Sequence, residues 1–537
     1  MSLRCRLLLV ATLSAAASLT AQAQTVAPGP APAATPPAAV APATPTTAST
    51  AMEPAPESPA QVSAPAASPV LTLEDAVLRA LEKNFDLRIQ TVARDNADEA
   101  LIIARSAFDP SFELTHRRSY ARGPSGSTVV NGNVVTGASS SVDADSTRIG
   151  VNQLLPTGGV VSASGALDRT ESTPLRTLPN PAYDSDVAIS VRQPLLRNAG
   201  TRLTRASIER AKLGVEIAQL DFKSSVLSVV RNVEVAYNNL AFAREQLIVR
   251  RFSLEVAQKL LEENRSRAAT GVATDLDVLQ AEVGLANATR NVLLAEQAVK
   301  DREDGLLAQI QPFGFSTAIG DVRLDDMPAP RINGDLSFKL ARDNTPEYLA
   351  QQASISQLQI DSDVARRNRL PTLDVGGALG YNTRETSYGS AMRNVWDGEG
   401  YSWAVDATLS FPWGLRGDRA RYRQTLNTLS REQIRLQAIE QDIMVQVRAA
   451  VRAVETNLES VRISEMATQL SQRQYELEKA RYDAGLSTFR RVQEAQEDLD
   501  NSRVSEIQAR VTLRNAVADL ARLEGSSLQR YRVNLED

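Results

Sequence analysis

The stretch from Leu203 to about Ala268 contains no proline and a single glycine, Gly214. At a rise of about 1.5 Å per residue, an uninterrupted helix of this length measures roughly 100 Å. A helix of that size needs partners, and its apolar residues recur in the heptad pattern that predicts a coiled-coil seam. The predicted seam residues are Val226, Val230, Val233, Tyr237, Leu240, Leu247, Leu254 and Leu261.

A second long stretch of helix formers runs over about residues 418–483, and its apolar residues also step by four and three. Both long stretches end in the same short break, a glycine followed by a threonine three positions later. Glycine suits the left-handed conformation that often follows a helix, so we expect Gly271 and Gly485 to end the two helices. The second seam comprises Val447, Val451, Val454, Leu458 and Val461.

Each break therefore predicts the tip of a helical hairpin. Thr274 and Thr488 are placed to cap the returning helices, which we expect over residues 275–310 and 489–523. The tips themselves span residues 270–274 and 484–488. Their central residues are Gly271, Val272, Ala273 and Thr274 in the first tip, and Gly485, Leu486, Ser487 and Thr488 in the second.

A shorter helix precedes each long one. Thr72 can cap a helix that extends, by its spacing, to about Ala107, and Pro110 then ends it. In the second half Pro346 suits a first helical turn, and Pro371 ends the helix. Pro110 and Pro371 are 261 positions apart, and similar segments follow both. The chain is therefore predicted to be internally duplicated.

Each shorter helix is followed by segments in which apolar and polar residues alternate, over about 111–193 and 372–411. Alternating segments of about ten residues are typical of transmembrane β-strands, although half of a soluble β-sandwich shows the same pattern. Beyond residue 70 no apolar run is long enough for a spanning helix. Aromatic residues near the strand ends favour a membrane interface. They are Tyr381, Trp396, Tyr401, Trp403 and Trp413.

The first half contains more strand material than the second. Strands are expected near Ser111–Tyr120 and Asp186–Arg192, and two further alternating runs around Pro156 predict an additional hairpin. Because its runs alternate like the others, we expect this hairpin to join the same sheet; the alternative is that it folds over an end. Four prolines mark the predicted junctions between strands and helices: Pro110, Pro194, Pro371 and Pro412.

The amino-terminal residues resemble a secretory signal peptide. Arg4 and Arg6 precede an apolar run, and small residues lead to an expected cleavage after Ala23, so residues 1–23 form the predicted signal. The following residues 24–70 hold 12 of the 25 prolines and almost no bulky apolar groups. That composition predicts a disordered, Pro/Ala-rich linker.

The side-chain inventory argues against an enzyme. The sequence has one histidine, His116, and one cysteine, Cys5, which lies in the predicted signal peptide. The adjacent carboxylates Glu262-Glu263 and Asp325-Asp326 are more typical of solvated surfaces than of catalysis. We therefore predict no catalytic residues, no metal and no cofactor. A formal net charge of -5 on an exported chain also makes nucleic acid an unexpected partner.

The duplicated order of helix, strands, long helix and returning helix, with the junction prolines and the Gly-x-x-Thr tips, resembles the outer-membrane efflux protein (TolC) family. The opening "LTLEDAVLRALEKNFDL" is similar to the start of these proteins. The resemblance implies a mainly α fold with a transmembrane β-barrel. Three chains close one barrel in the outer-membrane lipid, and their helices continue it as a coiled-coil α-barrel across the periplasm. The corresponding layout has a first repeat over 71–310, a connector over 311–335, a second repeat over 336–525 and a tail over 526–537.

The resemblance also implies that the tips dock on a periplasmic adaptor (membrane fusion) protein attached to an inner-membrane pump. In the family, acidic residues after the second Gly-x-x-Thr narrow the entrance. Here that stretch carries Arg490 and Arg491, and Glu494 is the acid that remains. We expect the two arginines to pair with Asp275 or Asp277 of an adjacent coil; the alternative is that all are solvated tip charges.

A second departure is strand number. The usual protomer of the family contributes four strands, whereas six here would give eighteen in a homotrimer and a wider pore.

The expected function is a passive outer-membrane channel with a large periplasmic portion, serving a tripartite efflux or type I secretion system. A structural coiled-coil protein linking the outer membrane to the cell wall is the alternative. It accounts for the heptads but not for the amphipathic strands.

Overall fold

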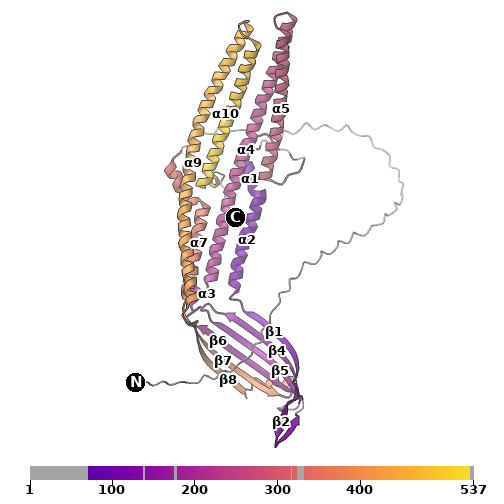
Figure 1. Ribbon diagram of the computed structural model, residues 1–537, viewed down its shortest axis with the longest axis vertical. Helices are drawn as coiled ribbons and strands as arrows, with labels where there is room; N and C mark the ends of the chain where they lie inside the picture. Colours follow the sequence, from indigo (N-terminus) through magenta and orange to yellow (C-terminus); the bar gives the residue numbers. More distant parts are fainter. Residues whose placement is uncertain are drawn as a thin grey trace, which may run out of the picture. The chain divides into compact units, whose positions relative to one another are not determined.

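The computed structural model describes residues 71–531, except for 137–138, 174–177, 316, 318, 323–331 and 398–399. The predicted signal peptide, the predicted linker, the Asp325-Asp326 pair and the last residues of the tail lie outside these ranges. In the described part, long helices project from one end of a β-sheet (Figure 1).

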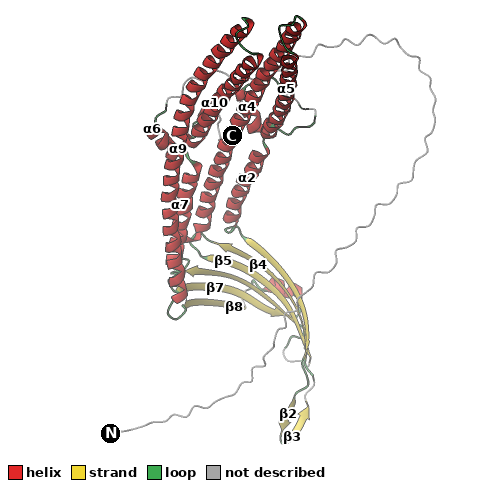
Figure 2. Ribbon diagram, turned by 45° about the horizontal axis from the view of Figure 1, so that its top comes forward, coloured by secondary structure: helices red, strands yellow, loops and turns green. Residues whose placement is uncertain are grey.

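Six strands form one antiparallel sheet in the order β1-β4-β5-β6-β7-β8 (Figure 1 and Figure 2). The two halves of the chain meet where β6 pairs with β7. The predicted additional hairpin is β4 and β5, and its inclusion in the sheet is confirmed. The strands are β1 (Ser111–Arg122), β4 (Ser141–Leu154), β5 (Val160–Thr173), β6 (Ala182–Pro194), β7 (Thr372–Glu385) and β8 (Gly400–Ser410).

Three short elements in the connections between strands were not predicted, and neither was the short helix α11 (Ser527–Arg530) in the predicted tail. The strands β2 (Ser127–Val130) and β3 (Asn133–Thr136) pair in a separate hairpin between β1 and β4. The helix α8 (Tyr388–Asn394) lies in the connection between β7 and β8. Each is too short for its apolar residues to show a period.

The shorter helix of each half is broken into two. The prediction of one helix from Thr72 to Ala107 is wrong, because Asn84 ends the first piece and its side chain accepts hydrogen bonds from the amides of Asp86 and Leu87. Thr72 does cap the first piece as predicted. The second half repeats the break, and its first piece begins inside the predicted connector. The four helices are α1 (Leu73–Lys83), α2 (Phe85–Ser106), α6 (Gly334–Asn344) and α7 (Pro346–Arg367).

The long helices follow the sheet. The predicted helix from Leu203 to Ala268 is interrupted at Arg205, where the backbone leaves helical geometry with ψ near 1°. The returning helices α5 and α10 are both 36 residues long. These elements are α3 (Thr201–Thr204), α4 (Ala206–Ala269), α5 (Asp275–Ile310), α9 (Arg416–Asp483), α10 (Phe489–Glu524) and α11 (Ser527–Arg530).

Most of the predicted seam residues lie in the cores of the helical region, whereas Leu247 and Leu254 are half-buried and belong to none of the core clusters. Val230, Val233 and Leu240 of α4 are fully buried, in a cluster that also contains residues of α1, α5 and α11. In the second half Val447 and Val454 of α9 are buried in the same way. Apolar burial along the hairpins is therefore the main stabilising term for helices of this length.

The turn between β4 and β5 is held against the chain that follows β6. The backbone N–H of Gly200 donates to the carbonyl of Thr157 at 3.0 Å, and the Thr157 hydroxyl donates to the Gln193 side chain, also at 3.0 Å. Gly158 adopts φ +91°, and a Cβ at this position would lie 2.5 Å from the carbonyl oxygen of Asn198. The additional hairpin is thus locked to the start of the long helices.

We expect Gly158→Ala to lower the midpoint of thermal unfolding in detergent, followed by circular dichroism, by several degrees. The positive φ alone costs about 1–2 kcal/mol for an L-residue, and the clash with Asn198 adds to it. Gly132→Ala is the matched control, because Gly132 has φ +81° but nothing within 4 Å of the new methyl group. Equal shifts in the two variants would show that the packing against Asn198 contributes nothing.

Candidate functional site

The two hairpin tips have the same backbone geometry. Gly271 and Gly485 adopt φ +77° and +75°, so both predicted left-handed glycines are confirmed. In the first tip the N–H of Val272 donates to the carbonyl of Arg267 at 2.9 Å, and in the second Leu486 donates to Arg481 at 2.8 Å. These bonds satisfy the last carbonyls of α4 and α9.

The returning helix of the first tip begins with a capping box. The Thr274 hydroxyl accepts from the Asp277 amide at 3.2 Å, and the Asp277 carboxylate accepts from the Thr274 amide at 3.0 Å. The hydrogen bonds from the side chain and the backbone of Thr274 lower the pKa of Asp277 below its ordinary value. The predicted cap at Thr274 is confirmed.

The second tip starts its returning helix differently. Thr488 occupies the N-cap position of α10, but its side chain makes no capping hydrogen bond, so that part of the prediction is wrong. The third helical residue here is Arg491, which cannot accept a bond from the Thr488 amide as Asp277 does for Thr274. Ser487 instead donates to Glu478 of α9 at 2.7 Å.

The charged residues of the tips are only partly paired within the chain. Arg490 forms an ion pair with Glu494, one turn along α10, at 2.9 Å. The pairing of Arg490 and Arg491 with Asp275 or Asp277 of an adjacent coil stays a prediction. Exposed ion pairs within one helix contribute little to stability, so the pair of Arg490 with Glu494 does not compete strongly with the predicted pairing to an adjacent coil.

A link between the two hairpins that was not predicted lies in the last turns of α4 and α9, just before the tips. The hydroxyl of Tyr482 on α9 donates to the side-chain oxygen of the fully buried Asn264 on α4, at 2.9 Å. Arg267 lies over the Tyr482 ring at 4.4 Å and pairs with Asp483 at 3.2 Å. An asparagine three positions beyond the seam residue Leu261 was the signal that could have indicated a polar contact there.

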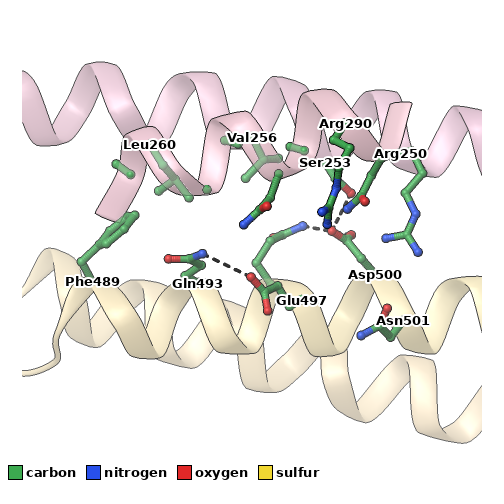
Figure 3. Close-up of a pocket in the computed structure, with 17 residues that line it drawn as sticks. Arg250, Ser253, Val256, Leu260, Arg290, Phe489, Gln493, Glu497, Asp500 and Asn501 are labelled. Atoms are coloured by element: carbon green, nitrogen blue, oxygen red, sulfur yellow. Dashed lines mark hydrogen bonds between the residues drawn. The ribbon is translucent and has the colours of Figure 1, made fainter. Parts of the chain in front are cut away.

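Further polar contacts join α4 to α10. Arg231 pairs with Asp519 at 2.6 Å, and Ser253 donates to Asp500 at 2.5 Å. Burial raises the pKa of Asp500. Ser253 and Asp500 border a cavity of about 340 Å³ between α4, α5 and α10 (Figure 3). The two hairpins therefore meet through hydrogen bonds, a partly open space and an apolar cluster near the tips, where Leu261 of α4 packs with Phe489 and Val492 of α10.

One face of the sheet carries a band of exposed apolar side chains. Outside this band the same face has polar contacts, in which Arg118 pairs with Asp143 and His116 lies beside Asp145. The register keeps apolar residues on the same face from strand to strand, as where Ile189, Leu379 and Trp403 lie side by side. Trp403 is 70% exposed. The exposed apolar side chains of this face are Phe112, Leu114, Ile149, Val151, Ile189, Val191, Leu379, Tyr381, Tyr401, Trp403, Val405 and Leu409.

The opposite face of the sheet is polar. Asp184 pairs with Arg384 across β6 and β7 at 2.6 Å. Arg192 lies 3.9 Å from Asp406, two strands away. A strand face that carries such pairs is suited to contact with water rather than with lipid.

The sheet has two open edges. Among the described strands β1 pairs only with β4, and β8 pairs only with β7. The four junction prolines lie where predicted: Pro110 and Pro371 immediately precede β1 and β7, Pro194 ends β6, and Pro412 follows β8.

No helix in the described part of the chain combines the length and apolar composition that crossing a membrane requires.

We expect Asp277→Ala to speed hydrogen exchange of the first amides of α5 by about two- to fivefold, because a helix cap contributes about 0.5–1 kcal/mol at an exposed end. Since folding lowers the pKa of Asp277, its contribution is complete above the ordinary pKa of about 4 and is lost as the pH falls through the lowered value. The ratio of variant to wild-type exchange, measured by mass spectrometry, should therefore shrink on acidification.

Asp275→Ala is the matched control, because Asp275 lies in the same helical turn but makes no capping bond. An equal effect of both substitutions would mean that only the charge near the helix start matters, and not the capping box.

A protein-family model described as outer membrane efflux protein matches residues 161–310 and 338–526. The pyoverdine export outer membrane protein OpmQ of Pseudomonas putida is 27% identical over 263 residues, which are 48% of this chain and 52% of that protein. Protein CyaE of Bordetella pertussis is 27% identical over 276 residues, which are 50% of this chain and 56% of that protein. The chain thus spans about half the length of the curated relatives it matches.

Solved structures show the same fold. The outer-membrane channel OprN superposes with a TM-score of 0.62 at 16% identity, covering 84% of this chain and 89% of that one. CusC gives a TM-score of 0.63 at 13% identity, covering 85% and 93%. The predicted fold class, mainly helical with a sheet and internally duplicated, is confirmed. Because the matching family model covers more than half of the chain and includes parts of both repeats, the chain belongs to the outer membrane efflux protein family.

Proposed function

We propose that the chain is the outer-membrane channel of a tripartite export system, a passive duct with a large periplasmic portion. The observation that carries this proposal is the sheet, which is apolar on one exposed face, polar on the other and open at both edges. In lipid every backbone N–H and C=O needs a hydrogen-bond partner, so an open edge is not tolerated there. The sheet therefore has to be closed by further copies.

Closure by identical copies fits the strand directions. β1 follows α2 and starts at the helical end of the sheet, whereas β8 precedes α9 and finishes there. Therefore β8 of one copy can run antiparallel to β1 of the next. Three copies of the six-stranded sheet give eighteen strands, and barrels of about 16–18 strands leave an aqueous channel. The polar face, with Asp184, Arg384 and Asp406, would line it.

The helical tips support docking on a periplasmic adaptor that is joined to an inner-membrane pump. They stand at the ends of the hairpins farthest from the sheet (Figure 1). Their closed turns present Val272 and Leu486, which are 76% and 73% exposed. Exposed apolar side chains on a defined backbone are typical of an interaction surface.

Cysteine cross-linking tests the closure. His116 on β1 and Val405 on β8 each lie five residues from the helical end of their strand and on the apolar face. We expect oxidation of a chain with cysteines at both positions, or at His116 with Trp403 or Ala407, to give a covalent trimer on a denaturing gel. The variants with Trp403 or Ala407 test the neighbouring registers of the two strands. Facing residues of adjacent antiparallel strands have Cα atoms close enough for a disulfide.

Single-cysteine variants are the controls and should migrate as monomers. If none of the three pairs gives a trimer while the protein still conducts ions in a planar bilayer, closure of β8 on β1 is wrong.

The charge at the predicted entrance is tested by conductance. We expect Arg490→Ala combined with Arg491→Ala to raise the single-channel conductance in a planar bilayer and to shift ion selectivity towards cations. The reason is that the double substitution removes two positive charges per copy from the predicted channel entrance. Arg79→Ala with Lys83→Ala, on the exposed side of α1, removes the same charge far from the tips. Unchanged conductance in the tip variant would contradict the predicted role.

A further inference from the structure

A second cavity, of about 440 Å³, lies where the sheet meets the helices. Three segments that are far apart in the sequence form its walls: the end of α2, the turn between β4 and β5, and the start of α4. The additional hairpin therefore supplies one wall. Its lining combines apolar groups with charged ones, and three of the four charged groups are cationic. The apolar groups belong to Phe108, Leu155, Pro156 and Ile208, and the charged groups to Arg105, Arg205, Lys212 and Glu209.

The two arginines differ from their neighbours in lacking an acidic partner. In the described ranges neither Arg105 nor Arg205 takes part in an ion pair, although both border the cavity. Lys212, which also lines it, is neutralised by Glu209 at 2.9 Å. Arg202 and Arg210 nearby pair with aspartates of α7 at 2.5 and 3.2 Å. The cavity thus concentrates positive charge that the chain does not compensate.

The cavity borders the face of the sheet that carries the apolar band. Gln153 of β4 lines it, and Val151 and Ile149 follow on the same face of that strand. The register sets Phe112 and Leu114 of β1 beside them. All four apolar side chains are exposed. A ligand with an anionic head in the cavity would find an apolar path along β1 and β4 for an attached chain.

We propose that this cavity binds the phosphate headgroup of an anionic phospholipid, with an acyl chain lying along β1 and β4. The inference rests on the proposed function, which places the apolar face in the outer membrane and the cavity at its periplasmic side. Guanidinium groups bind phosphate oxygens through charge-assisted, often bidentate hydrogen bonds. A basic pocket at the edge of a membrane-spanning surface is the arrangement that retains anionic lipids. The apolar lining and the apolar path favour a lipid over free phosphate.

The test uses the full protein, purified in detergent and titrated with phosphatidylglycerol or phosphatidylcholine, with bound lipids counted by native mass spectrometry. Wild type should retain phosphatidylglycerol in preference to phosphatidylcholine, up to one tightly held molecule per chain. Arg105→Gln with Arg205→Gln should reduce that retention at least about fivefold, because two charged hydrogen-bonding groups are lost. Arg105→Lys with Arg205→Lys should restore part of it, since the charge returns without the bidentate geometry.

Arg448→Gln with Arg452→Gln is the matched control, because it removes two exposed guanidinium groups of α9 far from the sheet and should leave retention within about twofold of wild type. Equal retention of the two lipids, or full retention by Arg105→Gln with Arg205→Gln, would overturn the proposal. Displacement of the lipid by millimolar inorganic phosphate would make this a site for free phosphate instead. Wild type that conducts in bilayers but shows no lipid preference refutes the lipid site alone, whereas wild type that fails to insert refutes the proposed function.

Discussion

The backbone N–H and C=O groups at the two open edges of the sheet need hydrogen-bond partners, and the other features of the architecture depend on this requirement. β1 and β8 each leave one row of backbone groups without a partner, and both strands are exposed along nearly their whole length. Such edges invite pairing with another chain. Because the sheet has an even number of antiparallel strands, its two edge strands run in opposite directions, and the edges of neighbouring copies can pair as antiparallel strands. The two faces of the sheet differ in polarity, so the closure proposed above would separate a largely apolar exterior from a polar interior.

The internal duplication is also visible in the helices, whose lengths and breaks repeat in the two halves. The pieces α1 and α2 of the first half recur as α6 and α7, each pair with the same lengths and the same one-residue break. Likewise α5 and α10 have equal lengths, and each starts after a tip with the same backbone geometry. The chain departs from this symmetry where the first half adds β4 and β5. That addition widens the sheet and, through the turn at Gly158, builds the cavity beside the helices.

Apolar and polar contacts have different roles in the helical region. Within each hairpin, heptad packing supplies most of the stabilisation but tolerates sliding. Between the hairpins, the hydrogen bonds of Tyr482 with Asn264 and of Ser253 with Asp500 join α4 to α9 and to α10 at particular positions along these helices. Buried polar pairs of this kind fix register more than they add stability. The tips therefore lie at defined levels relative to each other, as the docking surface proposed above would require.

The sequence by itself determined the elements whose signal is local and repeated. Heptad spacing, Gly271 and Gly485 at the tips, and period-two alternation in the strands each follow from the geometry of one segment, so helices, tips and sheet membership were predictable. Short elements such as α8, and the breaks at Asn84 and Arg205, were missed because a single polar residue gives no periodic signal. Only the tertiary structure decided which distant groups meet. The Tyr482 to Asn264 link and the pocket of Arg105 and Arg205 join segments far apart in the chain, and such contacts depend on how the helices pack, which no local pattern encodes.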